Sequence, residues 1–167
     1  METKDFEKAL PTILDEIGMQ EDGYIKTEDS VVVRVPEGFD FKSIIENILK
    51  KSGINIIYAD CKTEEPQSIF AKMDEAGWVG IIGSDDVDRA KLHEEEPVTS
   101  ILLIDHFSDL EDQRARTYIK SVLKVNNDVH ICGKKNIPVI LTFSSDEGIG
   151  FFYASTSIRI IDERHWK

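Results

Sequence analysis

The sequence predicts a single α/β domain in which a parallel five-stranded sheet lies between two layers of helices. Three observations support this fold class. Five aliphatic runs recur along the chain, amphipathic helical patterns separate them, and the runs are apolar throughout instead of alternating with polar residues. Such strands are buried on both faces, as in parallel sheets that helices cover on either side. No repeat or long Pro/Gly/Ser-rich linker divides the 167 residues, so one domain is expected over 1–167.

The first 30 residues are expected to add a helix and a short hairpin strand to this sheet. Apolar residues at helical spacing begin at Phe6 and end before Gly18, with Pro11 either in the first turn or at a kink. Residues 24–26 are predicted as a short strand, which a polar turn joins to the strand predicted at 30–35. The core of the domain is then expected over residues 31–161.

Strands and helices alternate through this core. Aliphatic runs predict the other four strands at 54–59, 100–104, 138–143 and 157–161. Residues 78–82 are predicted as a short strand or a buried turn. Residues 85–96 form a polar, acid-rich stretch that would suit a short exposed helix.

Three helices are predicted between these strands. The first covers 41–52 and ends at Gly53, the second covers 67–76 with Pro66 near its start, and the third begins at a capping box of Ser108 and Glu111. Helical spacing predicts their inward-facing residues: Phe41, Ile44, Ile45, Ile48 and Leu49 in the first, Ile69, Phe70 and Met73 in the second, and Ala115, Ile119, Val122 and Leu123 in the third.

Composition and charge exclude several classes of protein. The net charge is −12, whereas a protein that holds duplex DNA through its phosphates needs a basic face, so stable duplex binding is not expected. No apolar run is long enough to span a membrane, and the N-terminal METKDFEKAL lacks the apolar region of a signal peptide, so a cytoplasmic location is expected. Cys61 and Cys132 are expected to be reduced thiols, and the four histidines do not fall at metal-ligand spacing.

The loop after the strand at 30–35 has the position and length of a phosphate-binding loop. Such a loop needs small residues, so that backbone N–H groups can surround the phosphates, followed by a Lys and a Ser or Thr. Here the text is VVVRV-PEGFDFKS, and a gap-free alignment places Asp40 at the second glycine and Phe41 at the lysine. A one-residue slip recovers Lys42 and Ser43 but places Phe41 where glycine belongs. The alternative interpretation is that Asp40 caps the helix and Phe41 belongs to the core.

The strand at 100–104 is followed by an acid that could orient magnesium. Its text, SILLIDHF, is the Walker B pattern, with Asp105 at the metal-orienting position. The next residue, which would polarise the attacking water, is His106 instead of an acid. A histidine can act as a base, but no residue nearby in the sequence would orient it.

Two further segments resemble AAA+ ATPases. IPVILTFSS at 137–145 resembles the sensor-1 strand, above all that of clamp-loader (replication factor C-like) subunits, where the strand ends in Thr-x-Asn; Ser144 stands at that Asn. STSIRII at 155–161 resembles the Ser-Arg-Cys element and strand that follow, with Thr156 at the arginine that reaches a neighbour's phosphate. The resemblance covers residues 31–161. It implies the strand order 5-1-4-3-2, assembly in rings or partial rings, often around nucleic acid, and a site for ATP and magnesium at Lys42, Ser43, Asp105 and Ser144.

The departures from this family predict the loss of hydrolysis. The phosphate loop, the catalytic acid and the arginine finger are all replaced, and these are the parts that stabilise the charge of the transition state. The family's helical lid domain is also not expected, because the chain ends six residues after Ile161.

Three functions remain open on the sequence. The first is a non-catalytic, AAA+-like interaction or accessory protein, of a kind that would suit a phage or virus, which needs no cofactor and docks on a protein such as a replication or assembly ATPase. The second is a weak nucleotide-binding ATPase of the AAA+ class that uses ATP and magnesium. The third is an acidic inhibitor that mimics nucleic acid, which rests on the net charge of −12 alone.

Overall fold

The fold comes from a computed structural model, which describes residues 6, 8–16, 30–50, 53–76, 100–128, 138–145 and 159–162. The elements predicted at 24–26, 78–82 and 85–96 lie outside these residues, and so does Thr156.

Five parallel strands form one sheet, as the aliphatic runs predict. They are β1 (Ser30–Arg34), β2 (Asn55–Asp60), β3 (Ser100–Asp105), β4 (Val139–Phe143) and β5 (Arg159–Ile161), in the order β2-β3-β4-β1-β5. Every pair is parallel. This order is 5-1-4-3-2 counted from the other edge, so the topology expected from the AAA+ resemblance is confirmed.

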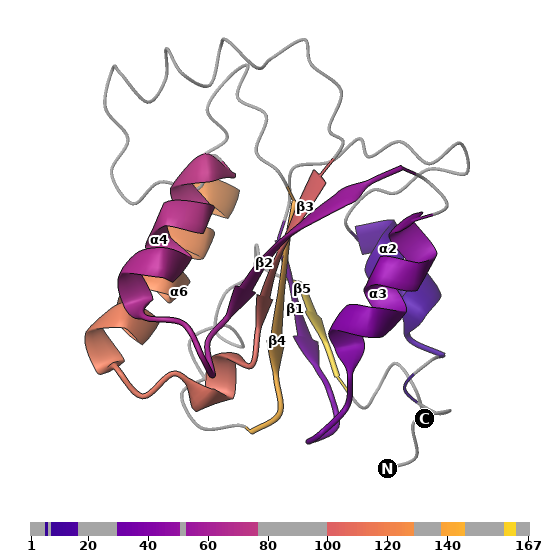
Figure 1. Cartoon of the computed structure of the whole chain (residues 1–167), viewed down its shortest axis with the longest axis horizontal. Coiled ribbons are helices and arrows are strands. Elements are labelled where there is room, and N and C mark those ends of the chain that lie inside the picture. Colours follow the sequence, from indigo (N-terminus) through magenta and orange to yellow (C-terminus); the bar gives the residue numbers. More distant parts are fainter. Residues whose placement is uncertain are drawn as a thin grey trace, which may run out of the picture.

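Helices cover both faces of the sheet. The helices α2 (Leu10–Glu16) and α3 (Phe41–Lys50) lie on one face, and α4 (Pro66–Glu75) and α6 (Gln113–Asp128) lie on the other (Figure 1). Pro11 occupies the first turn of α2, where its missing N–H costs no hydrogen bond. No helix within the described residues is long and apolar enough to cross a membrane.

Alternate residues of each strand pack into two separate hydrophobic cores, one on each face of the sheet. Val32 and Leu102 belong to the core under α4 and α6, whereas Val31 and Leu103 belong to the core under α2 and α3. Successive side chains of a strand point to opposite faces, so a strand inside a three-layer domain needs apolar residues at every position. All five residues of β4 are accordingly buried, including Thr142.

The start and end of α3 follow the predicted signals. Asp40 caps the helix, because its Oδ1 accepts the backbone N–H of Ser43 at 3.1 Å. Gly53 stands beyond the end of the helix with φ of +70°. The N–H of Gly53 donates to the carbonyl of Lys50, and the N–H of Ile54 donates to the carbonyl of Leu49. This is the Schellman arrangement, in which glycine takes the left-handed conformation without a steric cost.

The predicted capping box of Ser108 and Glu111 is wrong. Ser108 lies inside a short 3-10 helix, η1 (Phe107–Asp109), and α6 begins five residues later at Gln113. Asp112 caps α6 instead, because its Oδ1 accepts the N–H of Ala115 at 3.0 Å. The observed cap thus lies four residues beyond the predicted one, because η1 occupies the segment where the helix was expected to begin.

Candidate functional site at the carboxyl edge of the sheet

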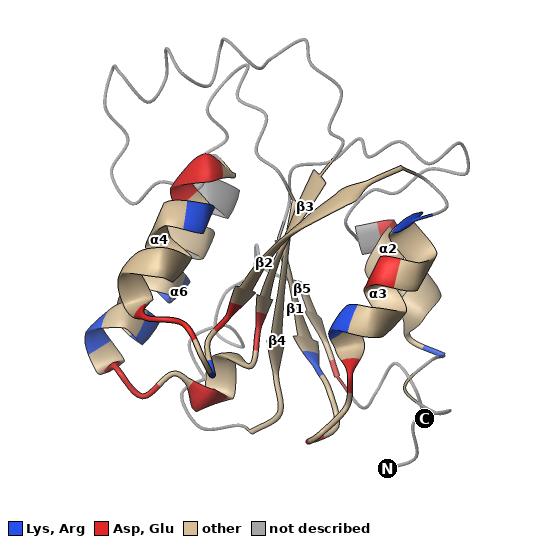
Figure 2. Ribbon diagram, viewed as in Figure 1, with Lys and Arg blue, Asp and Glu red and all other residues tan. Residues whose placement is uncertain are grey.

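The candidate site residues meet at one edge because the strands are parallel and in register. Asp60, the last residue of β2, pairs with Asp105, the last residue of β3. The carboxyl ends of such strands are where open α/β sheets bind ligands. This edge is rich in acids (Figure 2). The described acidic positions at the strand ends and in the segments that follow them are Glu37, Asp40, Asp60, Glu64, Glu65, Asp105, Asp109, Glu111, Asp112 and Asp162.

Asp105 is a buried carboxylate that three donors satisfy. The residue is only 3% exposed. Oδ1 accepts the hydroxyl of Thr142 on β4 and the backbone N–H of His106 at 3.1 Å, and Oδ2 accepts the hydroxyl of Tyr58 on β2 at 2.8 Å. Both oxygens therefore bind protein donors, as buried polar atoms generally do.

Tyr58 lies between Lys42 and Asp105, two of the predicted site residues. The ammonium of Lys42 lies 4.2 Å from the centre of the Tyr58 ring, while the hydroxyl at the other end of that ring reaches Asp105. Burial, together with the hydrogen bond to Asp105 and the charge of that acid, raises the pKa of Tyr58 above its usual value. The phenol therefore stays a donor to Asp105 at neutral pH. The sequence patterns did not single out Tyr58, because it stands within an ordinary strand.

His106 has an orienting partner that lies far away in the sequence. Its Nδ1 lies 2.9 Å from Oδ1 of Asp60, which is 46 residues earlier. The backbone of His106 is left-handed, with φ of 58° and ψ of 42°, a conformation that is costly for a residue with a Cβ. Its N–H also lies 3.0 Å from the hydroxyl oxygen of Thr142. The imidazole is thus held against the sheet edge as a half-buried, oriented group.

Asp60 is itself held in the form that accepts hydrogen bonds. Burial opposes its ionisation, but the hydrogen bonds from His106 and from the backbone N–H of Lys62 outweigh burial and hold its pKa below the usual value. The Thr63 hydroxyl adds a third bond at 3.1 Å. This pairing of β2 and β3 was foreseeable from the expected strand order, since neighbouring parallel strands end side by side.

The loop between β1 and α3 donates its own N–H groups within itself. The N–H of Phe39 donates to the carbonyl of Pro36, that of Phe41 to the carbonyl of Phe39, and that of Ser43 to Asp40. Gly38 turns the chain with φ of +77°. A phosphate loop instead points successive N–H groups at its ligand, whereas these three N–H groups donate to acceptors of the chain itself.

Aromatic packing also holds this loop against the core. The Phe39 ring packs edge-on against Phe6, with centroids 4.7 Å apart, and Phe41 packs against the same ring at 5.9 Å. Phe41 is fully buried, which confirms its predicted place in the core. This burial agrees with the interpretation in which Asp40 caps the helix and Phe41 belongs to the core.

Lys42 and Ser43 make contacts that differ from those of a nucleotide site. Lys42 lies over Tyr58 and forms an ion pair with Glu46 at 3.6 Å, one turn along α3. The Ser43 hydroxyl donates to Oδ2 of Asp40 at 2.7 Å, and the bonds from Ser43 hold the pKa of Asp40 below its usual value. To bind phosphate and magnesium, both residues would have to exchange these contacts for the ligand.

Ser144, the predicted sensor position, lies half-buried beyond the end of β4. Its backbone N–H and that of Ser145 each donate to the hydroxyl oxygen of Ser108 at 3.1 Å. Ser108 therefore joins η1 to the chain beyond β4. This bond places Ser144 on the same edge as Asp105, whose neighbour in the sheet is Thr142.

The thiol of Cys61 is buried beside the same edge. Burial, followed by the charges of Asp60 and Asp105, raises its pKa to about 12, so it stays protonated at neutral pH. It is a free cysteine, as expected. Within the described residues, no three His, Cys, Asp or Glu side chains are placed to hold a metal ion.

Comparisons with known proteins agree with the observed topology. No protein-family model and no curated protein sequence matches the chain. It is similar to a chain in a structure of Drosophila ORC bound to DNA, with a TM-score of 0.54 and 9% identity over 95% of this chain and 89% of the other.

A second similar structure is that of the Aeropyrum pernix ORC2 protein in ADPNP–ADP complexes. Its TM-score is 0.50 with 13% identity over 95% of this chain, which spans 46% of that protein's length. At these identities the likeness concerns the fold. The chain thus shares the α/β fold of these two ORC structures, with a parallel five-stranded sheet flanked by helices.

Proposed function

We propose that the chain is a non-catalytic, AAA+-like interaction protein, which docks on a protein partner such as a replication or assembly ATPase and needs no nucleotide. The observation that carries this proposal is the closed loop between β1 and α3. Three of its N–H groups donate within the loop or to its capping acid, and Ser43 donates its hydroxyl to Asp40. ATP would have to replace these bonds in order to use the same three N–H groups and the Ser43 hydroxyl.

The charge of the carboxyl edge supports the same proposal. A nucleotide phosphate brought to this edge would meet the carboxylates of Asp40, Asp60 and Asp105. Like charges repel most strongly where water is partly excluded, as around the buried Asp105. Lys42, the cation that a phosphate would use in the slipped alignment, forms an ion pair with Glu46 at 3.6 Å.

Addition of ATP and magnesium is expected to leave the melting temperature unchanged. A ligand present at about 100 times its Kd would stabilise the native state by about 2.7 kcal/mol. For a chain of this size that gain raises Tm by roughly 5–10 °C, which a thermal-shift titration detects easily. Magnesium alone and ADP with magnesium serve as controls. An ATP-dependent rise that Lys42→Ala removes would contradict the proposal.

One observation favours the weak ATPase as a second candidate. Asp60 orients the His106 ring, which stands where AAA+ enzymes carry the catalytic acid, so a base is present at this position. If this candidate is correct, the purified protein releases phosphate from ATP at a rate above background. The turnover must be lost in His106→Ala and in Lys42→Ala, since a contaminating ATPase would be insensitive to both.

Duplex DNA is expected to bind only weakly. The similar Drosophila ORC structure contains DNA. In this chain the carboxyl edge carries mainly acids; the basic residues there include Arg34 at the end of β1, Lys42 in the first turn of α3 and Lys62 in the loop after β2. A few phosphate contacts give affinities that fall steeply with salt. Fluorescence anisotropy with a labelled duplex at about 150 mM salt should therefore show no sub-micromolar binding. Tight binding that persists at this salt concentration would replace the protein partner with a DNA-handling role.

A further inference from the structure

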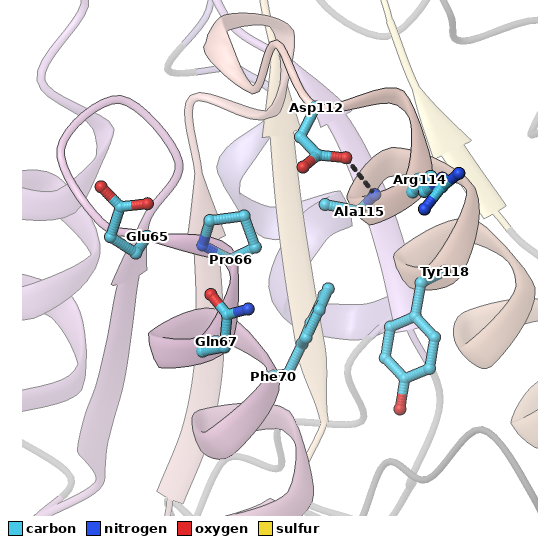
Figure 3. A pocket seen from close by; sticks show the side chains of 8 residues that line it. All are labelled: Glu65, Pro66, Gln67, Phe70, Asp112, Arg114, Ala115 and Tyr118. Carbon is cyan, nitrogen blue, oxygen red and sulfur yellow. Dashed lines mark hydrogen bonds between the residues drawn. The ribbon is translucent and has the colours of Figure 1, made fainter.

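A groove with an aromatic floor lies between α4 and α6, on the face of the sheet away from α2 and α3 (Figure 3). Its volume is about 530 Å³, and its walls are the first turns of both helices. Pro66 and Phe70 line it from α4, and Tyr118 lines it from α6. It is separate from the polar network around Asp105.

The floor exposes an aromatic ring. Tyr118 is 41% exposed and is the one large hydrophobic side chain so exposed within the described residues. Its ring packs against Phe70, with centroids 4.5 Å apart and an angle of 57° between the planes. Exposed tyrosines that rest on a second apolar side chain are typical anchors of protein interfaces, because the ring offers a large contact area with little loss of rotamer freedom.

The rim of the groove is acidic on both sides. Glu65 stands at the start of α4 and Asp112 at the start of α6, and both side chains are exposed. Glu65 makes no capping hydrogen bond, although it occupies the N-cap position. Arg114 is the single basic residue among those that line the groove. Glu111, next to Asp112, is exposed as well. A positively charged ligand therefore complements this rim, and a phosphate does not.

We propose that this groove binds a basic peptide segment of the protein partner, which places an apolar side chain on the paired rings of Phe70 and Tyr118 and a lysine or arginine against Glu65 on the other side of the groove. The inference rests on the proposed function, because it names the chemistry of the partner's docking segment. The apolar side chain gains contact area on the two rings, and the cation gains from the exposed Glu65 carboxylate, which makes no capping hydrogen bond.

Two short fluorescein-labelled peptides test the proposal by fluorescence anisotropy. One contains Arg, Leu and Gly, and in its twin Glu replaces every Arg. The basic peptide is expected to bind and the acidic twin is not. Glu65→Gln and Tyr118→Ser are each expected to weaken binding by about tenfold, which corresponds to about 1.4 kcal/mol. Glu75→Gln, which makes the same charge change at the other end of α4, is the matched control and should leave binding unchanged.

Backbone chemical shifts of the folded variants provide a second measurement. Addition of the basic peptide should move the amide signals of residues 65–70 and 112–118 in particular. The proposal is overturned if the basic peptide fails to bind, if Glu75→Gln weakens binding as much as Glu65→Gln, or if Tyr118→Ser has no effect. Each of these results leaves the response to ATP and magnesium unaffected, so failure of the groove and failure of the proposed function can be told apart.

Discussion

The substitution Phe41→Ala is expected to lower the free energy of unfolding by about 3–5 kcal/mol. Phe41 is fully buried, begins α3, and packs against Phe6 in the core between α3 and the sheet. Removal of the ring leaves a cavity that the surrounding strands can close only in part, because both faces of the sheet are already packed. Chemical denaturation followed by circular dichroism measures the loss as a lower midpoint with an unchanged slope.

Asn47→Ala is the matched control for this substitution. Asn47 is exposed on the same helix, so its loss should change stability by no more than about 0.5 kcal/mol. An unchanged midpoint in Phe41→Ala would place the ring outside the core. The slipped alignment, with Lys42 and Ser43 in a phosphate loop, would then regain its basis.

The fold was predictable because each element has a local cause. Continuous aliphatic runs predict buried parallel strands, and they place the ends of β2, predicted at 54–59 and observed at Asn55–Asp60, to within one residue. The last strand is shorter than predicted, Arg159–Ile161 instead of 157–161. Helix α4 likewise begins at Pro66 because a proline is stable in the first turn. The strand order came from the AAA+ resemblance, which periodicity alone does not contain.

The candidate site was predictable only in part, because its contacts join residues far apart in the chain. Asp105 and Ser144 were identified from the ends of their strands. Tyr58 and Asp60 were not, since a tyrosine and an acid at the end of a strand are common. Their roles depend on the in-register pairing of β2 with β3, which sets the Tyr58 hydroxyl and the Asp60 carboxylate beside the segment at Asp105 and His106.

Asp105→Ala is expected to destabilise the protein on the order of 2–4 kcal/mol. The substitution removes the acceptor of three donors, namely the hydroxyls of Thr142 and Tyr58 and the N–H of His106. Thr142 is fully buried, so its hydroxyl has no ready access to water, whereas the half-buried Tyr58 can recover part of its loss. Tyr58→Phe removes one donor only and should cost about 1 kcal/mol. The same denaturation assay compares the two variants with the unmodified chain.

The sign of the Asp105 effect separates a structural acid from a metal-binding acid. An acid kept for magnesium stands among other negative charges when the metal is absent, so its removal relieves repulsion and leaves stability unchanged or higher. An acid whose oxygens accept protein hydrogen bonds stabilises the fold without metal, and its removal exposes those donors. We therefore expect Asp105→Ala to be less stable than the unmodified chain in the presence of a chelator, and magnesium to leave the stability of both unchanged. The opposite result is that Asp105→Ala is as stable as the unmodified chain under chelation and that magnesium stabilises only the unmodified chain. Asp105 would then have kept a metal-binding role, and the nucleotide-binding alternative would replace the proposed interaction protein.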